Sequence, residues 1–513
     1  MNAFLMYRDR DFDLEQEPPP GAQDLVQDLE LEVLFKAMAE GDPFLLHVTK
    51  KAVLSLLNDV AAVLHRQDIL RDCLSNAAIV RNLYTLAAET IERERKNYWG
   101  VHSRNPGYVL NRSVEVLSMF LAVLRRLRQV AEVHAARFRS EGFTMLFATL
   151  RKELDDEYLA TVEAHLSRLK FRRGVLISAR LGKGNMGVGH MLRKPNDDDR
   201  PWIQRFFSKR PIAYTFHIHE RDDAGAQAVS ELRDRGIAIA AYAVAQSNDH
   251  ILSFFRMLRT ELAFYVGCLN LHERLAAKGE PIFFPVPSPC AERRYVVCGL
   301  YDVCLTLKLE HRVVGNDADG EGKELFMITG ANQGGKSTFL RSVGLSQLMM
   351  QCGMFVPARS YCANLCAALF THYKREEDAA MQSGKLEEEL ERISTIVDRL
   401  SPDCIVLFNE SFQSTNEREG SEIGRQIVQA LLESRVKVFF VTHMYALASS
   451  FSDEKIGNTM FLRAESREDG TRTFRVIPGE PLRTSFGKDL YEQIFRTSAT
   501  APLKLPKNAC AVI

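Results

Sequence analysis

Apolar residues recur at helical spacing through most of the first third of the chain. From about residue 31 to residue 169 they are separated by three or four positions, the spacing of one helix face. Two such runs are Leu54, Leu57 and Val60 with Ala61 and Leu64, and Leu117, Phe120, Leu124 and Leu127. The sequence Asn105-Pro106-Gly107 marks a break between two long helices. We therefore predict an α-helical domain over residues 33–170.

The pattern changes to alternation after residue 170. Val175, Ile177 and Ala179 alternate with polar neighbours, and a glycine-rich stretch follows over residues 182–189. Residues 213–219 alternate again. Alternation of this kind is typical of strands with one buried face. Residues 171–222 are therefore predicted to form a small β-rich insertion.

Helical spacing returns over residues 226–235 and 248–278, so residues 223–280 are assigned as returning helices of the first domain. Prolines then punctuate residues 281–289, and alternating strand and helix patterns begin near residue 291. We assign residues 281–513 to an α/β domain. The fold class is a multi-domain protein, in which a helical domain with a β-rich insertion precedes a C-terminal α/β domain.

Composition excludes some classes of protein. The 513 residues are 46% hydrophobic and 26% charged, with 66 basic and 66 acidic side chains. This balance excludes a strongly basic histone-like binder and an acidic buffering protein, but a local basic patch still permits nucleic-acid binding. No run approaches the ~18 uncharged apolar residues of a membrane span, and no signal peptide is recognised. Ten scattered cysteines without a CxxC pair suggest a reducing, cytoplasmic location.

Charge is concentrated in two segments of this neutral chain. Residues 1–32 contain nine acidic residues and two arginines, and three consecutive prolines interrupt them, so we expect an acidic, flexible N-terminal tail. Residues 167–210 contain twelve basic and three acidic residues. Either a solvated charged face or sequence-independent contact with DNA phosphates would explain this excess. The candidate DNA-binding residues are Arg168, Lys170, Arg172, Arg173, Arg180 and Lys183.

The most informative motif is a phosphate-binding loop. A hydrophobic strand at residues 325–328 leads into Gly330-Ala-Asn-Gln-Gly334-Gly335-Lys336-Ser337, and an amphipathic helix follows. In this context glycines let backbone N–H groups surround phosphates, the lysine reaches the β- and γ-phosphates, and the serine hydroxyl holds Mg²⁺. The motif predicts ATP and Mg²⁺ as cofactors. The predicted nucleotide contacts here are Gly330, Asn332, Gly334, Gly335, Lys336, Ser337 and Thr338.

Two further strands end in polar residues that suit this chemistry. Residues 404–408 form a buried strand followed by Asn409 and Glu410. Glu410 is the candidate general base for an attacking water, and Asn409 occupies the position where an ATPase usually has a metal-binding aspartate. A third strand, residues 436–442, ends at His443, which is predicted to act at the γ-phosphate.

These motifs resemble those of the MutS family, the ATPases of DNA mismatch repair and their relatives, over roughly residues 293–487. Asn332 inside the phosphate loop, the sequence Val356-Pro357-Ala358, Thr442-His443 and Ser485-Phe-Gly487 are similar to family motifs. The resemblance implies lever helices, a clamp-like DNA-binding insertion, a P-loop ATPase of the ABC type and a homodimer. Ser383 and Gly384 match the start of the family signature that contacts the partner's nucleotide.

The sequence departs from the family pattern at four places. Asn409 replaces the metal-side aspartate, and residues 411–420 are only loosely similar to the family motif that follows it. The Ser-Thr that should follow Gly384 is Lys385-Leu386, and the helical region begins near residue 31. The last departure leaves no room for a mismatch-reading domain and predicts the truncated MutS-related branch. A DNA-binding ATPase without mismatch-specific reading is therefore expected. An ATPase whose helical arms engage a protein or structured RNA, and a nucleotide-gated scaffold with low turnover, remain as alternatives.

Overall fold

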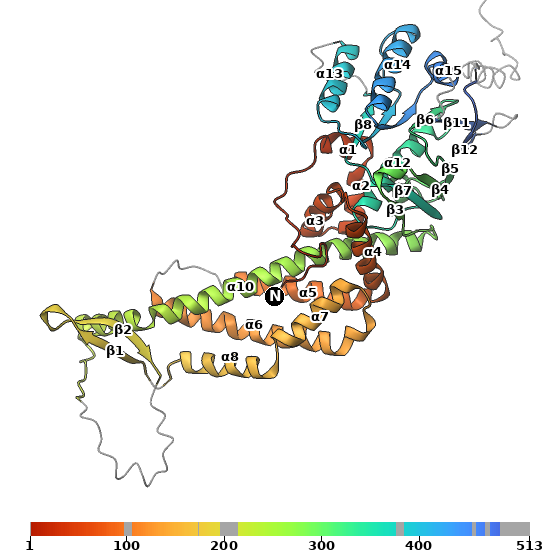
Figure 1. Cartoon of the computed structure of the whole chain (residues 1–513). Helices are drawn as coiled ribbons and strands as arrows, with labels where there is room; N and C mark the ends of the chain where they lie inside the picture. Colours follow the sequence, from red (N-terminus) through yellow and green to blue (C-terminus); the bar gives the residue numbers. More distant parts are fainter. Residues whose placement is uncertain are drawn as a thin grey trace, which may run out of the picture. The chain divides into compact units, whose positions relative to one another are not determined.

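The computed structural model describes residues 2–96, 105–172, 174–194, 214–375, 384–453, 458–466 and 472–482. Figure 1 shows its helices and strands. The chain divides into two compact units: Met1–Phe12 with Ser75–Leu262, and Asp13–Leu74 with Ala263–Ile513.

The first unit is a set of long helices with one hairpin. Its helices are α5 (Ala77–Lys96), α6 (Pro106–His134), α7 (Glu141–Glu153), α8 (Asp156–Leu169) and the first part of α10 (Asp223–Ala277). Leu110, Val114, Leu117 and Leu121 of α6 pack with Leu159 of α8 in one buried cluster, at the helical spacing that the sequence shows. The helical domain is thus confirmed. The two expected returning helices are one helix, α10, of 55 residues.

Helix α6 contains a long apolar segment. The segment Pro106–Arg137 has an 18-residue window of mean hydropathy 1.3, long and apolar enough to cross a membrane, although we expected no such segment. Half of that window is buried, because its apolar side chains form the core just described. The pattern is therefore typical of a core helix.

The described part of the insertion contains one antiparallel hairpin, β1 (Leu176–Leu181) and β2 (Gly187–Arg193). The expected third strand at residues 213–219 is wrong for its described part, because Tyr214–His219 adopts no regular structure. No strand in the described part of the chain pairs with this segment, and Tyr214 and Phe216 are 91% and 78% exposed. Alternation alone does not make a strand without a second strand or a core to cover one face.

The second unit is built on a six-stranded sheet in the order β12-β11-β6-β10-β9-β8. All neighbours are parallel except β12, which pairs antiparallel with β11. The strands are β6 (Leu325–Thr329), β8 (Leu369–Tyr373), β9 (Ile405–Asn409), β10 (Lys437–Val441), β11 (Thr459–Ser466) and β12 (Arg472–Pro478). The helices that follow them are α12 (Lys336–Gln351), α13 (Lys385–Val397), α14 (Glu417–Glu433) and α15 (Tyr445–Asp453).

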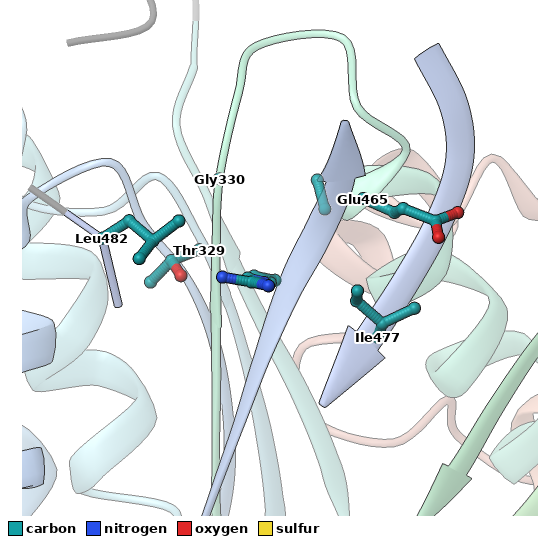
Figure 2. A pocket seen from close by; sticks show the side chains of 7 residues that line it. Thr329, Gly330, Glu465, Ile477 and Leu482 are labelled. Carbon is teal, nitrogen blue, oxygen red and sulfur yellow. The ribbon is translucent and has the colours of Figure 1, made fainter. Parts of the chain in front are cut away.

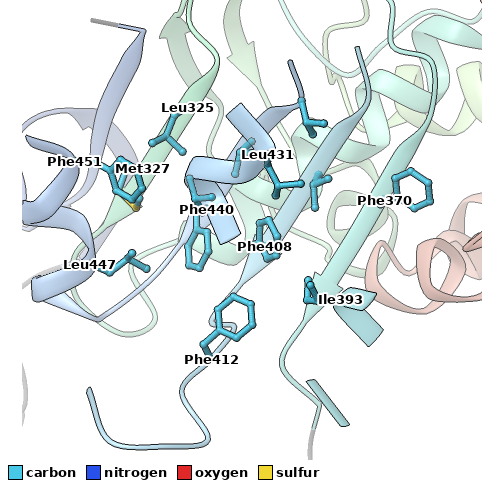
Figure 3. Packing of buried hydrophobic residues seen from close by; sticks show 14 of the residues in the cluster. Leu325, Met327, Phe370, Ile393, Phe408, Phe412, Leu431, Phe440, Leu447 and Phe451 are labelled. Atoms are coloured by element: carbon cyan, nitrogen blue, oxygen red, sulfur yellow. The ribbon is translucent and has the colours of Figure 1, made fainter. Parts of the chain in front are cut away.

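Both faces of this sheet are buried. On one face Met327, Phe408 and Phe440 pack against Leu431 of α14 and Leu447 of α15, and Figure 3 shows these side chains in one cluster. On the other face Phe326 and Phe439 stack at 4.2 Å between ring centroids. A parallel sheet covered on both sides requires such continuous apolar strands. The α/β domain with polar strand ends is confirmed.

A smaller sheet completes the second unit. Its order is β3-β7-β4-β5, and α11 lies between β4 and β5 in sequence. The remaining elements are β3 (Val286–Ser288), β4 (Tyr295–Leu300), α11 (Val303–Lys308), β5 (Asn316–Asp319), β7 (Ser360–Asn364), α1 (Ala22–Asp28), α2 (Leu31–Ala39), α3 (Pro43–Leu54) and α4 (Val60–Ser75).

Helices α1 to α4 belong with the second unit and not with the first, contrary to the expected boundary at residue 33. The buried guanidinium of Arg66 donates to the carbonyl of Cys352 at 3.2 Å. The side chain of Gln67 donates to the carbonyl of Pro285 at 3.0 Å. We assigned these helices to the same domain as those after residue 75 because of their helical periodicity. Such periodicity shows that one face of a helix is buried, but not which element covers it.

Residues 2–32 are packed, so the expectation of a flexible acidic tail is wrong for them. Leu5 is fully buried, and its N–H donates to the carboxylate of Glu261 at 2.6 Å. Helix α1 contacts β8, and its Asp24 forms an ion pair with Arg375. Glu30 pairs with Lys308 and Arg341. Asp24 and Glu30 are tolerated in this packed segment because basic partners distant in sequence neutralise them.

Candidate functional site

The phosphate loop joins β6 to α12 at the carboxyl end of the parallel strands. Gly330 and Gly335 have φ angles of 116° and 93°, which favour glycine. A Cβ atom at Gly335 would lie 2.8 Å from the carbonyl oxygen of Phe474. At Gly334 it would lie 2.6 Å from the Cβ of Ala464. Neighbouring strands β11 and β12 therefore hold the loop closely, and only glycines fit these positions.

Lys336 is the first residue of α12, and its side chain turns back onto the loop. Its Nζ donates to the carbonyl oxygens of Gly330 at 2.9 Å and Ala331 at 2.8 Å. Burial lowers the pKa of the Lys336 ammonium to about 8, while the charge of Glu410 acts in the opposite direction. An ammonium held in this way is partly desolvated, so a phosphate would be a strong partner for it.

Ser337 and Asn409 meet at the start of α12. The hydroxyl of Ser337 donates to Oδ1 of Asn409 at 2.9 Å. Both groups present oxygen atoms, the ligands that Mg²⁺ prefers in proteins, although neither is charged. Thr338 follows in the first turn of the helix and is half-buried, and Asn332 is exposed on the loop. The donor set fits a hydrated Mg²⁺ ion bound together with phosphate oxygens.

Glu410 follows β9 directly and lies beside His443, which follows β10. Its Oε1 is 2.8 Å from Nε2 of His443, and the two side chains are 30% and 27% exposed. The hydrogen bond from His443 lowers the pKa of the Glu410 carboxyl, and burial opposes this shift. Glu410 is therefore a carboxylate at neutral pH. Strand order explains the contact, because β9 and β10 are neighbours and end at the same edge.

The remaining predicted nucleotide contacts lie near α13. Gly384 precedes this helix as its N-cap, and a Cβ built there would meet no atom within 4 Å. Ser383 lies outside the described residues. The motif residues Ser485–Gly487 also lie outside them.

Five of the six candidate DNA-binding residues are described, and they belong to the first unit. Arg168 and Lys170 are at the end of α8, Arg172 is in the turn that follows, Arg180 is on β1 and Lys183 is in the hairpin turn. All five are exposed. Arg173 lies outside the described residues.

Sequence reasoning missed a buried polar network next to Glu410. His372 of β8 lies 2.6 Å from the hydroxyl of Ser411, and burial lowers the pKa of the His372 imidazole to about 3. Glu389 of α13 accepts hydrogen bonds from the N–H of Phe412 at 3.0 Å and the hydroxyl of Ser414 at 3.1 Å. The loop after Glu410 is thus attached to the helix that Gly384 begins. These residues belong to none of the sequence motifs described above.

A cavity of about 160 Å³ adjoins the phosphate loop on the side of β11 and β12. It is lined by Thr329 and Gly330 at the end of β6, by Glu465, and by Ile477 and Leu482, as Figure 2 shows. The guanidinium of Arg472 on β12 also donates to the side chain of the loop residue Gln333. These two strands therefore support the loop from the side opposite to Glu410.

Two parts of the chain match protein-family models. Residues 58–278 match the MutS2 N-terminal domain, and residues 326–497 match MutS domain V, an ABC-type ATPase domain. The DNA mismatch repair protein MutS of Syntrophomonas wolfei is 32% identical over 177 residues, 33% of this chain and 20% of that protein. MutS protein homolog 4 of Mus musculus is 30% identical over 149 residues, 29% of this chain and 16% of that protein. The chain thus spans about a fifth or less of the length of these two relatives.

Proposed function

Because the chain belongs to the MutS family, we propose that it is an ATP-hydrolysing, DNA-binding protein that acts as a homodimer. The observation that carries the proposal is the arrangement at the carboxyl edge of the sheet. Lys336 lies on the phosphate loop, Ser337 contacts Asn409, and Glu410 contacts His443. These groups can bind phosphate, hold a divalent ion and activate water.

Each residue takes one role in hydrolysis. Lys336 and the N–H groups of the loop would hold the phosphates, and Ser337 with Asn409 would hold Mg²⁺. When bound, Mg²⁺ supplies neutralisation of negative charge on the phosphate oxygens. Glu410 accepts a proton from water, and His443 keeps the carboxylate oriented through Oε1. Oε2 of Glu410 is the oxygen left for the water.

DNA binding is supported by the exposed basic residues of the first unit and by the family. MutS relatives generally bind DNA and dimerise. The proposed contact is with phosphates and does not depend on sequence, since Arg168, Lys170, Arg172, Arg180 and Lys183 are exposed cations without a common reading helix. The homodimer is supported by the family and by Gly384, which precedes α13 and matches the start of the family signature that contacts the partner's nucleotide.

One observation favours low turnover as a second candidate. Asn409 is neutral where the family has an aspartate, so Mg²⁺ would be held less strongly. A nucleotide-gated scaffold would then bind ATP and hydrolyse it slowly.

Filter binding at two salt concentrations tests DNA as the partner. A matched duplex, a G·T heteroduplex, a branched DNA and a structured RNA are titrated in parallel with ATP. We expect the two linear duplexes to bind alike, with a loss of affinity on the order of 10³ between 50 and 200 mM salt if about six phosphates are contacted. Preference for the RNA alone would contradict DNA as the ligand. A strong preference for the heteroduplex would contradict binding without mismatch reading.

A further inference from the structure

The β1–β2 hairpin exposes more apolar surface than its packing explains. Ile177 and Leu192 face each other across the hairpin, and Leu192 packs against the core of the first unit. Five other large apolar side chains are exposed: Leu176 by 48%, Leu181 by 79%, Met186 by 67%, Val188 by 46% and Met191 by 42%. Exposed apolar side chains grouped on one small element indicate a binding surface.

The two most exposed of these side chains lie at the turn. Leu181 pairs with Gly187, so no side chain on β2 stands directly opposite it. Met186 is next to Gly187, and its carbonyl accepts the N–H of Gly182 at 2.8 Å. A Cβ at Gly182 would lie 2.8 Å from Cγ1 of Val188, so glycine keeps the turn narrow. The hairpin therefore ends in a narrow turn, the hairpin tip, which carries the branched side chain of Leu181 and the flexible side chain of Met186.

The charge of the hairpin limits what can cover this tip. Residues 174–194 contain Arg180, Lys183, Arg193 and Lys194 and no acidic residue. Two copies of such a hairpin repel each other, whereas a polyanion attracts it. In DNA, phosphates line the outside of a groove, and apolar base faces lie between the stacked pairs. Cations beside a narrow apolar tip match that arrangement, in which apolar side chains enter a base step from the minor groove.

We propose that the hairpin tip enters the minor groove of DNA and that Leu181 and Met186 insert between neighbouring base pairs. Arg180 and Lys183 contact the flanking phosphates. The inference rests on the proposed DNA binding and adds to it a mode of recognition: the tip kinks the duplex at pyrimidine–purine steps, which a matched duplex and a G·T heteroduplex both contain. Such insertion kinks a duplex by roughly 20–90°. Pyrimidine–purine steps and branched DNA, which deform most easily, should bind best.

The test uses the full chain and a short duplex that carries 2-aminopurine at TA steps and a donor and acceptor dye at its ends. The fluorescence of 2-aminopurine rises when bases unstack, and energy transfer between the dyes rises when the duplex bends. The test variant combines Leu181→Ser and Met186→Ser. The matched control is Met145→Ser, on α7 of the same unit, where the methionine is 53% exposed.

We expect the parental chain and the control to raise both signals. The double variant should lose both signals and bind roughly tenfold more weakly, with its salt dependence kept, because the basic residues remain. The proposal is overturned if the double variant unstacks and bends DNA as the parent does, or if the parent binds the duplex without either signal. Those results leave DNA binding intact, whereas no binding of the parent at low salt removes the proposed function itself. Binding to anionic lipid vesicles, lost in the double variant while duplex bending stays, would assign the tip to a membrane and overturn the proposal.

Discussion

Glu410 adopts a left-handed backbone conformation, with a φ angle of 56°. This conformation costs a non-glycine residue roughly 1–2 kcal/mol. The N–H of Glu410 donates to the carbonyl of Val441 at 2.9 Å, and its carboxylate accepts from His443. These bonds fix the backbone and direct the side chain along the edge of the sheet. Strain that is held by specific contacts at a strand end is typical of a functional position.

Asn409 brings no negative charge to the proposed Mg²⁺ site. Its Oδ1 accepts the hydroxyl of Ser337, as an aspartate oxygen could. We expect Asn409→Asp to lower the Mg²⁺ concentration needed for half-maximal hydrolysis, roughly tenfold, because a negative charge is added to the metal site. A Mg²⁺ titration of ATP hydrolysis measures this. An unchanged midpoint would mean that Asn409 does not face the metal.

At the scale of elements, the segment Asp13–Asp28 and the turn after it are part of the second unit. Leu29 is fully buried, and a Cβ at Gly344 of α12 would lie 2.8 Å from its Cδ2. Leu29→Ala should lower the free energy of unfolding by about 2–5 kcal/mol, as expected for a leucine buried in a packed core. Chemical denaturation measures the change, and Gln27→Ala, at an exposed neighbour, is the control. A flexible segment would give the same small effect for both variants.

The first residues of the chain dock through a buried carboxyl. Glu261 of α10 accepts the N–H groups of Leu5 and Phe12, at 2.6 and 3.2 Å. Burial raises the pKa of Glu261 to about 7, and the charge of Asp11 adds to this. The folded state therefore binds a proton that the unfolded state has released, so stability falls as pH rises from about 4.5 to about 7.

Replacing this carboxyl should remove that pH dependence. Glu261→Gln should flatten the difference in unfolding free energy between pH 5 and pH 8, by up to about 3 kcal/mol, because an amide does not titrate. Denaturant unfolding at the two pH values measures it. Glu231→Gln, at an exposed residue paired with Arg235 on the same helix, is the control and should keep the parental slope. If the unfolding free energy of all three proteins depended on pH in the same way, Glu261 would not be the group that titrates.

A contact in this protein can be predicted from the sequence when the residues that form it are close together along the chain. The phosphate loop could be predicted because its residues are contiguous between a buried strand and a helix. Glu410 and His443 could each be assigned from their positions after a buried strand, but the contact between them was not predicted, because the order of the strands in the sheet is not visible in the sequence. The packing of residues 2–32 could not be predicted, because Asp24 and Arg375 are 351 positions apart. The network of His372, Ser411 and Glu389 joins residues from separate elements and has no periodic pattern.

At the scale of the whole molecule, the proposed homodimer places part of each ATP site on the partner. Lys336→Ala removes phosphate binding within one chain, and Ser383→Ala removes the contact made to the partner. Each variant alone should hydrolyse little ATP. Mixing the two should restore activity, because a mixed dimer has one complete site. Activity that does not rise on mixing, or full parental activity from a monomer in light scattering, would contradict shared sites.

The central claim is that the site formed by Lys336, Ser337, Asn409, Glu410 and His443 hydrolyses ATP with Glu410 as the base. The most direct test compares the parental chain with Glu410→Gln in single-turnover hydrolysis and in equilibrium ATP binding. Glutamine keeps the shape and can still accept from His443, but it cannot take a proton from water. We predict unchanged ATP affinity with hydrolysis slowed at least 10²-fold. Hydrolysis by Glu410→Gln at the parental rate would contradict the account.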